Sequence, residues 1–475
     1  MDRIILLVLL VLLERFAQGA PEFLFVGGNN GIDTFLVDGK KYTKASSLSQ
    51  TGGTSWIALH PTHRYLYAAS KENVDYNGRK SGQVVAYSIH EETGVLTQLN
   101  KKPSGDIKGP ASFLFNKLGF LVVANYVGSA VDTAYGVSVL RVNQDGSLGD
   151  LTDVAQLTGK SIVANRQKGP HAHDIAIRSG QNFQQYVFVP DLGSDVIWQF
   201  ELTPQGKLKP GPKTTVPAGS GPRHMKFHPS LNVAYVLTEL NARLLRYTFK
   251  PATGTLEYVA DYAILPKEAP YTQYKASAAE LQISEDGKRL FASVRSVGKI
   301  GMFAIDGSGD LRFEGALTNL GKPRFFDISP DQAQLYVCNQ DGLTNNVRVF
   351  NVDGKAFTED EDVTQMDVVG ARTLVFDFEA KSETSQATTV ASTDNGKGSS
   401  TVSDTGVTTV AMSGTSTGSV ETTVSSSSSE VTTTTANPST PVAASVAFSL
   451  RSLSLLRTMG VILCFQYAVL STICI

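Results

Sequence analysis

The stretch that decides the fold runs Gly221-Pro-Arg-His-Met-Lys-Phe-His-Pro229 and continues to Ala234-Tyr-Val-Leu237 and Leu244-Leu-Arg-Tyr-Thr-Phe249. In the first segment, apolar Met225 and Phe227 alternate with polar neighbours, which is the period-two pattern of a strand. Short turn sequences separate the three segments. The stretch therefore predicts an antiparallel meander.

The same pattern recurs along the chain. Six copies of strand, turn and strand begin near residues 56, 112, 173, 223, 280 and 324. The spacing is about fifty residues, which is the period of propeller blades. One small sheet cannot bury both of its faces alone, whereas radial stacking of several sheets buries them all.

Two incomplete copies stand at the ends of this region. Residues 23–37 contain two strands of a blade but lack its first strand, and Arg372–Asp377 is a first strand with nothing after it. Together they would make a seventh blade that closes the ring. We therefore predict an all-β fold, a seven-bladed β-propeller over residues 20–380 closed by its N- and C-terminal strands.

The start of the chain has the pattern of a secretory signal peptide, which we assign to residues 1–19. Arg3 gives a positive start, Ile4–Leu13 is an apolar core, and Ala17-Gln-Gly19 offers small residues for cleavage. Residues 381–445 are dominated by Ser and Thr and contain too little apolar surface to fold. They predict a disordered, O-glycosylated stalk.

Residues 446–475 predict a hydrophobic anchor signal. An apolar run, Met459–Ile475, follows a spacer and the small residues Ala443–Ser445, which is the order of a glycolipid-anchor signal. A C-terminal membrane helix is the alternative, because the seventeen-residue run is just long enough to span a membrane. We expect a protein of the secretory pathway, held at the cell surface through this segment.

Composition limits the class of partner. The formal net charge is −2, so no basic excess suggests a nucleic-acid partner. Cys338 is the one cysteine before the tail, and Cys464 and Cys474 lie in the tail, so no disulfide framework is predicted. We expect a monomer that relies on its apolar core.

Four polar residues lie at strand ends in consecutive copies: His173, Arg223, Glu239 and Arg295. In a propeller such ends meet at the mouth of the axial channel, so we predict that these four are catalytic. Two guanidiniums bind a carboxylate or phosphate and stabilise an oxyanion. A histidine is suited to general acid–base work, and a carboxylate can orient it, hold an arginine or activate water.

Three further residues are predicted to contact the substrate: His171, His224 and Asn125. His171 lies two residues before His173 on the same side and competes for its role. No metal or other cofactor is expected, because the histidines lack partners at zinc-site spacing. The sequence also has no Gly-X-Ser-X-Gly elbow, no phosphate loop and no dinucleotide fingerprint.

The motifs Gly-Pro-His-Ala-His-Asp (169–174), Gly-Pro-Arg-His-Met-Lys-Phe-His-Pro (221–229) and Ala-Ala-Glu-Leu-Gln-Ile-Ser-Glu-Asp-Gly (278–287) resemble the seven-bladed propeller lactonase family. That family contains bacterial 6-phosphogluconolactonase and fungal 3-carboxy-cis,cis-muconate cyclase. The resemblance places the family's histidine, arginine, glutamate and second arginine on the four residues above. Thr238 stands where such lactonases often carry asparagine.

The resemblance implies a lactonase that hydrolyses an acidic sugar lactone or a carboxylated lactone. The secretion signal departs from the cytoplasmic setting of the phosphate-using members. Two alternatives stay open. The same residues could close a muconate-like diacid into a lactone, as a cycloisomerase does, or the propeller could be a non-catalytic surface-binding protein or antigen.

Overall fold

The computed structural model describes residues 21–106, 109–126, 133–266, 275–340, 346–354, 356–361 and 366–377. The predicted signal peptide, Ser/Thr-rich stalk and hydrophobic anchor segment lie outside the described residues. Among those described, we find no helix with the length and apolar character needed to cross a membrane.

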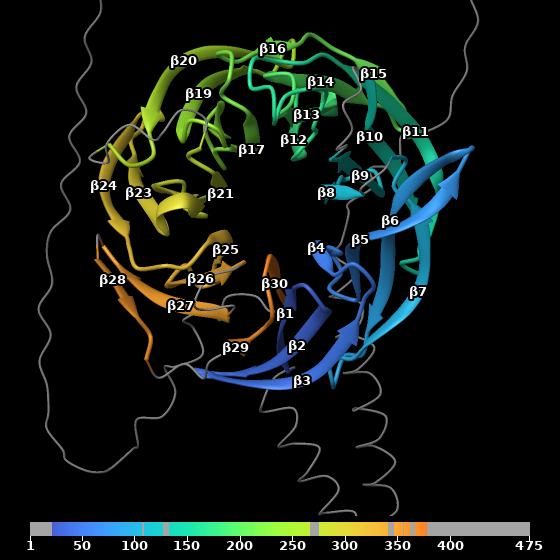
Figure 1. The fold of residues 1–475 in the computed structure, drawn as a ribbon, viewed down its shortest axis with the longest axis vertical. Coiled ribbons are helices and arrows are strands. Elements are labelled where there is room, and N and C mark those ends of the chain that lie inside the picture. The colour runs from blue at the N-terminus through green and yellow to red at the C-terminus, as the bar shows by residue number, and fades with distance from the viewer. Residues whose placement is uncertain are drawn as a thin grey trace, which may run out of the picture. The chain divides into compact units, whose positions relative to one another are not determined.

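The described strands form seven antiparallel sheets arranged radially around one axis (Figure 1). In each sheet the strand nearest the axis comes first in chain order, except in the blade that joins the two ends. The prediction of a seven-bladed propeller is confirmed. Its only described helices are two short 3-10 helices, η1 (Gln181–Phe183) and η2 (Arg295–Val297).

The six blades formed by consecutive strands are numbered 1 to 6 in chain order, and the blade that joins the two ends is called the closing blade. Blade 1 contains β4 (Thr54–Leu59), β5 (Tyr65–Tyr76), β6 (Arg79–Ile89) and β7 (Leu96–Pro103). Blade 2 contains β8 (Pro110–Phe115), β9 (Phe120–Asn125), β10 (Thr133–Val142) and β11 (Leu148–Thr158). Blade 3 contains β12 (Ala176–Ser179), β13 (Gln185–Asp191), β14 (Val196–Leu202), β15 (Leu208–Pro210) and β16 (Thr214–Thr215).

The second half of the ring follows the same plan. Blade 4 contains β17 (Pro222–Phe227), β18 (Val233–Thr238), β19 (Arg243–Lys250) and β20 (Thr255–Ala263). Blade 5 contains β21 (Ala278–Ile283), β22 (Arg289–Val294), β23 (Lys299–Ile305) and β24 (Leu311–Leu317). Blade 6 contains β25 (Pro323–Ile328), β26 (Gln334–Asn339), β27 (Asn346–Asp353), β28 (Ala356–Glu359) and β29 (Met366–Asp367).

The closing blade joins the two ends of the described chain. Its inner strand β30 (Thr373–Asp377) pairs with β1 (Glu22–Gly27), and β2 (Gly31–Asp38) and β3 (Lys41–Ser49) complete the sheet. The pairing is antiparallel and runs from Phe23 opposite Asp377 to Gly27 opposite Thr373. The two incomplete copies in the sequence therefore do form one blade.

The apolar core is divided into seven clusters, one between each pair of neighbouring blades. Strand β18 shows how one strand serves two of them. Its side chains alternate, so Tyr235 and Leu237 pack towards blade 5 while Ala234 and Val236 pack towards blade 3. Stacking thus buries both faces of a sheet, as the repeat pattern predicted.

Ring closure makes a first prediction. Leu374 of β30 is fully buried and packs with Leu24 and Val26 of β1. Leu374→Ala should lower the free energy of unfolding by about 2–5 kcal/mol, because a buried leucine is replaced by a cavity where β1 and β30 join the two ends of the described chain. Urea unfolding measures this. The control is Val369→Ala, whose side chain is half exposed; equal losses in the two variants would contradict the prediction.

Candidate active site

The inner strands of blades 1, 2, 4, 5 and 6 carry a β-bulge at the same place. In blade 4, Pro222 lies opposite Thr238 and His224 opposite Leu237, so Arg223 is the extra residue. A bulge re-aims the side chain that it adds. Four residues added in this way line a central cavity: Ser55, Ala111, Arg223 and Arg324.

The cavity has a volume of about 570 Å³, which is the size of a small-molecule site. Its charged lining is mostly positive: Lys71, Arg166, Arg223, Arg295 and Arg324 face a single carboxylate, that of Glu239. The remaining lining residues are Ser55, Asn73, Gly109, Pro110, Ala111, Tyr126 and His173. Five cations around one carboxylate make a site for an anion.

All four residues predicted to be catalytic line this cavity. Arg223 lies in β17, Glu239 follows β18, and Arg295 begins η2 after β22. Gly221, with a φ of +64°, makes the turn before β17; a Cβ there would lie 2.7 Å from Leu240 Cγ. The turn thus requires a glycine just ahead of Arg223.

His173 was expected to begin the first strand of its blade, and this was wrong. Strand β12 begins at Ala176. The His173 amide donates to the carbonyl of Pro190 at 3.0 Å. Pro190 has no N–H to donate in the opposite direction, so the regular antiparallel pairing with β13 does not extend to His173. His173 therefore lies in an extended segment beside the inner end of β13.

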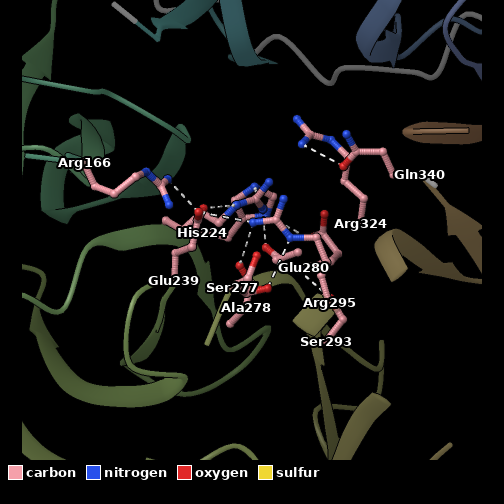
Figure 2. Close-up of polar contacts among 12 residues, drawn as sticks. Arg166, His224, Glu239, Ser277, Ala278, Glu280, Ser293, Arg295, Arg324 and Gln340 are labelled. Carbon is pink, nitrogen blue, oxygen red and sulfur yellow. Dashed lines mark hydrogen bonds and ion pairs between the residues drawn. The ribbon is translucent and has the colours of Figure 1, made fainter. Parts of the chain in front are cut away.

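Glu239 holds three arginines from three parts of the chain (Figure 2). Arg166 Nη2 lies 2.7 Å from Glu239 Oε1, Arg295 Nη2 lies 3.2 Å from the same oxygen, and Arg223 Nε donates to Oε2 at 3.0 Å. The Glu239 and Arg223 side chains are 5% and 3% exposed, so these charge interactions are weakly screened.

The surroundings of Glu239 fix its charge. Burial alone would raise its pKa, but the guanidiniums of Arg295, Arg223 and Arg166 outweigh burial and lower the pKa to about 2. Glu239 is therefore ionised at neutral pH and fully engaged by arginines. Of the three roles considered for it, holding arginines is the one that this geometry favours.

His224 and Glu280 support Arg223 from behind. His224 Nδ1 lies 2.9 Å from Glu280 Oε1, and His224 Nε2 lies 2.7 Å from Arg223 Nη1. Arg223 can only donate, so His224 Nε2 accepts its hydrogen bond. His224 Nδ1 therefore carries the ring proton and donates a hydrogen bond to Glu280 Oε1. Arg223 Nη1 also donates to the carbonyl of Ala279. His224 does not line the cavity; it fixes the direction of the guanidinium.

His173 is placed by its neighbour Asp174. The Asp174 carboxylate accepts from Ser112 Oγ of blade 2 and from the Met225 amide of blade 4, each at 3.0 Å. Burial, and then the charge of Arg223, lower the pKa of His173 well below its usual value. Its ring is therefore neutral at pH 7, and Nδ1 has no hydrogen-bond partner among the described residues.

The other two residues predicted to contact substrate lie outside the cavity lining. The ring of His171 stacks on Tyr126, with 4.7 Å between centroids, and it is Tyr126 that lines the cavity. Asn125 is fully buried and donates to the carbonyls of Ser104 and Tyr135, at 2.7 and 3.3 Å. Of the two competing histidines, the structure places His173 at the cavity.

Three lining cations were not predicted: Lys71, Arg166 and Arg324. Arg324 had a signal, because Lys-Pro-Arg-Phe at 322–325 repeats the position of Gly-Pro-Arg-His at 221–224. Arg166 lies in the connection between β11 and β12, which has no strand periodicity. Lys71 lies within the long strand β5, where nothing in the pattern separates it from a surface lysine.

No metal centre is built by the described residues, since none of their His, Cys, Asp and Glu side chains form a group of three placed to hold an ion. The candidate site therefore consists of a neutral histidine, a clamped carboxylate and cationic side chains within one cavity. Such a set suits proton transfer and anion stabilisation.

Comparison with known proteins agrees with the fold. The family model described as "Lactonase, 7-bladed beta-propeller" matches residues 23–376. The 6-phosphogluconolactonase of Formosa agariphila is 31% identical over 312 residues, which are 63% of this chain and 81% of that protein. That of Bacillus subtilis is 28% identical over 334 residues, covering 69% of this chain and 88% of that protein.

A solved structure has a similar fold. The periplasmic gluconolactonase of Pseudomonas aeruginosa matches with a TM-score of 0.65 at 26% identity, and the match covers 75% of this chain and 99% of that one. The fold and its central cavity define a propeller of the lactone-handling class. The chain belongs to the lactonase family of seven-bladed β-propellers.

The Glu239 clamp makes a second prediction. Glu239→Gln should lower the free energy of unfolding at pH 7 by about 3–5 kcal/mol, because buried guanidiniums lose their counter-charge. The folded-state pKa of Glu239 is about 2, below the ordinary 4.5. Its contribution is thus complete above pH 4.5 and is lost as the pH falls towards 2.

Denaturant unfolding of wild type and variant at pH 7 and pH 3 tests this. The matched control is Glu257→Gln, which breaks an exposed pair with Lys250 and should change stability by less than about 1 kcal/mol. A Glu239 variant as stable as the control at pH 7 would show that the arginines do not need the carboxylate.

Ionisation of Glu280 should affect stability in the opposite direction to that of Glu239. Burial raises its pKa to about 7 from 4.5, so between these values the folded protein keeps a proton that the unfolded chain has lost. The free energy of unfolding therefore decreases as the pH rises from 4.5 to 7. Glu280→Gln cannot ionise and keeps the acceptor for His224, so it should be stabilised relative to wild type at pH 8 by up to about 3 kcal/mol.

Unfolding measured at pH 5 and pH 8 tests the role of Glu280. The advantage of the glutamine variant should be present at pH 8 and small at pH 5. An advantage of the same size at both pH values would mean that ionisation of Glu280 is not its cause.

Proposed function

We propose that the protein hydrolyses a small lactone that carries an acidic group, such as a sugar lactone with a phosphate or carboxylate. The observation that carries this is the cavity, in which four arginines and a lysine surround a single, already clamped carboxylate and a neutral histidine. Such a cavity attracts anions and contains a proton acceptor next to guanidinium donors.

The reaction would begin with water attacking the lactone carbonyl carbon. His173 is the base: its neutral ring takes the proton from water as the new C–O bond forms. Arg223 and Arg295 donate hydrogen bonds to the developing oxyanion, which a preorganised cationic site stabilises. The ring C–O bond then breaks, the protonated His173 returns the proton to the leaving oxygen, and the product is a hydroxy acid.

The supporting residues have distinct tasks in this scheme. Glu239 keeps Arg166, Arg223 and Arg295 in one place, although their like charges repel. His224 and Glu280 set the direction of Arg223, and Asp174 holds the His173 segment between blades 2 and 4. In this scheme these four residues position the groups that act on the substrate.

The comparisons favour a sugar lactone. Two of the similar proteins are named 6-phosphogluconolactonase and a third is a periplasmic gluconolactonase. The third is named for a compartment outside the cytoplasm, which is compatible with a secreted protein of this fold. We propose, from residues 1–19 and 446–475, that this chain works at the cell surface.

Lactone opening by the purified protein tests the proposal. Acid release from gluconolactone and its 6-phosphate should exceed the rate in buffer, and His173→Ala should lower kcat/KM by about 10²–10⁴-fold, the range for a lost general base. His90→Ala, in the turn after β6, is the matched control and should retain wild-type activity.

Two outcomes would overturn the proposal. Wild-type protein that opens no acidic or neutral lactone faster than buffer would favour a non-catalytic binding protein. Activity that is unchanged in His173→Ala would remove the histidine from the reaction.

A further inference from the structure

The cations of the cavity fall into two groups that differ in how they are compensated. Arg166, Arg223 and Arg295 all contact Glu239. Lys71 and Arg324 form no ion pair with any residue in the described ranges, and the one hydrogen bond from the Arg324 side chain goes from Nη1 to Gln340 Oε1 at 3.3 Å. In Figure 2, Arg324 and Gln340 lie apart from the Glu239 cluster.

The two groups also come from different sides of the ring. The Glu239 group is supplied by the segment before blade 3 and by blades 4 and 5. Arg324 comes from the bulge of β25 in blade 6, and Lys71 from β5 in blade 1, which flank the closing blade. The cavity therefore has a second positive wall, across from the wall that contains His173 and Arg223.

This second wall is electrostatically incomplete. Lys71 keeps an exposed surface, and partial desolvation together with the nearby charges of Arg372 and Arg324 lowers the pKa of its ammonium group to about 8. Burial and the charges of Arg223 and Arg295 lower the pKa of Arg324 to about 9. Desolvation is the larger cause of both shifts and neighbouring positive charge adds to it, and an anion bound in the cavity would oppose both.

We propose that Lys71 and Arg324 form a subsite for the acidic substituent of the substrate, the phosphate or carboxylate remote from the lactone ring bond. This assignment rests on the proposed function. An anion bound there would leave the lactone carbonyl facing the wall that contains His173 and Arg223. Asn73, in the same irregular part of β5 as Lys71, and Ser55 of the β4 bulge also line the cavity and offer neutral donors.

Arg324 suits this role better than the clamped arginines. The charge of Arg223 is shared with Glu239, whereas the only described partner of Arg324 is a neutral amide oxygen that orients its planar fork. A guanidinium that is oriented but not neutralised binds an oxyanion in a bidentate way. The subsite would therefore decide which lactones are bound, while the opposite wall opens the ring.

Steady-state kinetics on a matched pair of lactones tests the subsite. Lys71→Gln and Arg324→Gln should each lower kcat/KM for 6-phosphogluconolactone at least tenfold, mainly through KM, and should lower the value for gluconolactone by a much smaller factor. Arg324→Lys should recover part of the loss because it keeps the charge. Arg312→Gln, which removes an exposed arginine of β24, is the control for lost charge alone.

Binding without turnover separates this inference from the proposed function. Calorimetry with gluconate 6-phosphate, glucarate and gluconate compares a phosphate, a carboxylate and a hydroxyl at the same carbon. Wild type should bind at least one of the first two at least tenfold more tightly than gluconate, and Lys71→Gln should abolish that preference. Whichever of gluconate 6-phosphate and glucarate binds more tightly identifies the preferred acid group.

Wild type that opens no lactone but shows the preference, lost in Lys71→Gln, would keep the subsite and overturn the proposed function. Wild type that opens lactones while Lys71→Gln and Arg324→Gln retain the full preference would overturn the subsite. Losses of equal size on charged and neutral lactones would show a general defect of the cavity, and this too would overturn it.

Discussion

The ionised carboxylate of Glu239 is the contact on which the candidate site depends. Three guanidiniums converge on it from a connecting segment and from two blades, and without a counter-charge they would repel one another in a buried place. Both oxygens of this carboxylate are engaged by the arginines. Glu239 is thus an organiser of positive charge, and the surplus positive charge is what gives the cavity its affinity for acids.

The propeller makes this convergence possible through two repeated features. Stacking of the blades buries the sheets and brings seven inner strands to one axis, and the bulge near the start of most inner strands turns one side chain into the space that they enclose. Where the bulge residue is small, as at Ala111, it makes room; where it is arginine, as at Arg223 and Arg324, it supplies charge. One architecture therefore sets both the volume and the charge of the site.

Much of this follows from the sequence. The fifty-residue period predicted six blades, and the complementary fragments at the ends predicted the seventh, closing blade. His173 lies in the segment that precedes β12, whereas Arg223, Glu239 and Arg295 were found because they stand at strand ends that a propeller brings together. His224 and Asn125 share that location but point into hydrogen bonds behind the cavity, a difference of side-chain direction that strand periodicity does not resolve. Arg166 and Lys71 carry no positional signal, since one lies in an irregular segment and the other in an extended strand.

The division of the cavity into a compensated and an uncompensated wall links the fold to a chemical role, because it gives an acidic lactone one orientation. A crystal structure with gluconate 6-phosphate bound tests this most directly. The phosphate should lie within hydrogen-bonding distance of Lys71 and Arg324, with the product carboxylate against Arg223 and His173. A ligand bound outside the cavity, or bound with its phosphate on the Glu239 arginines, would contradict it.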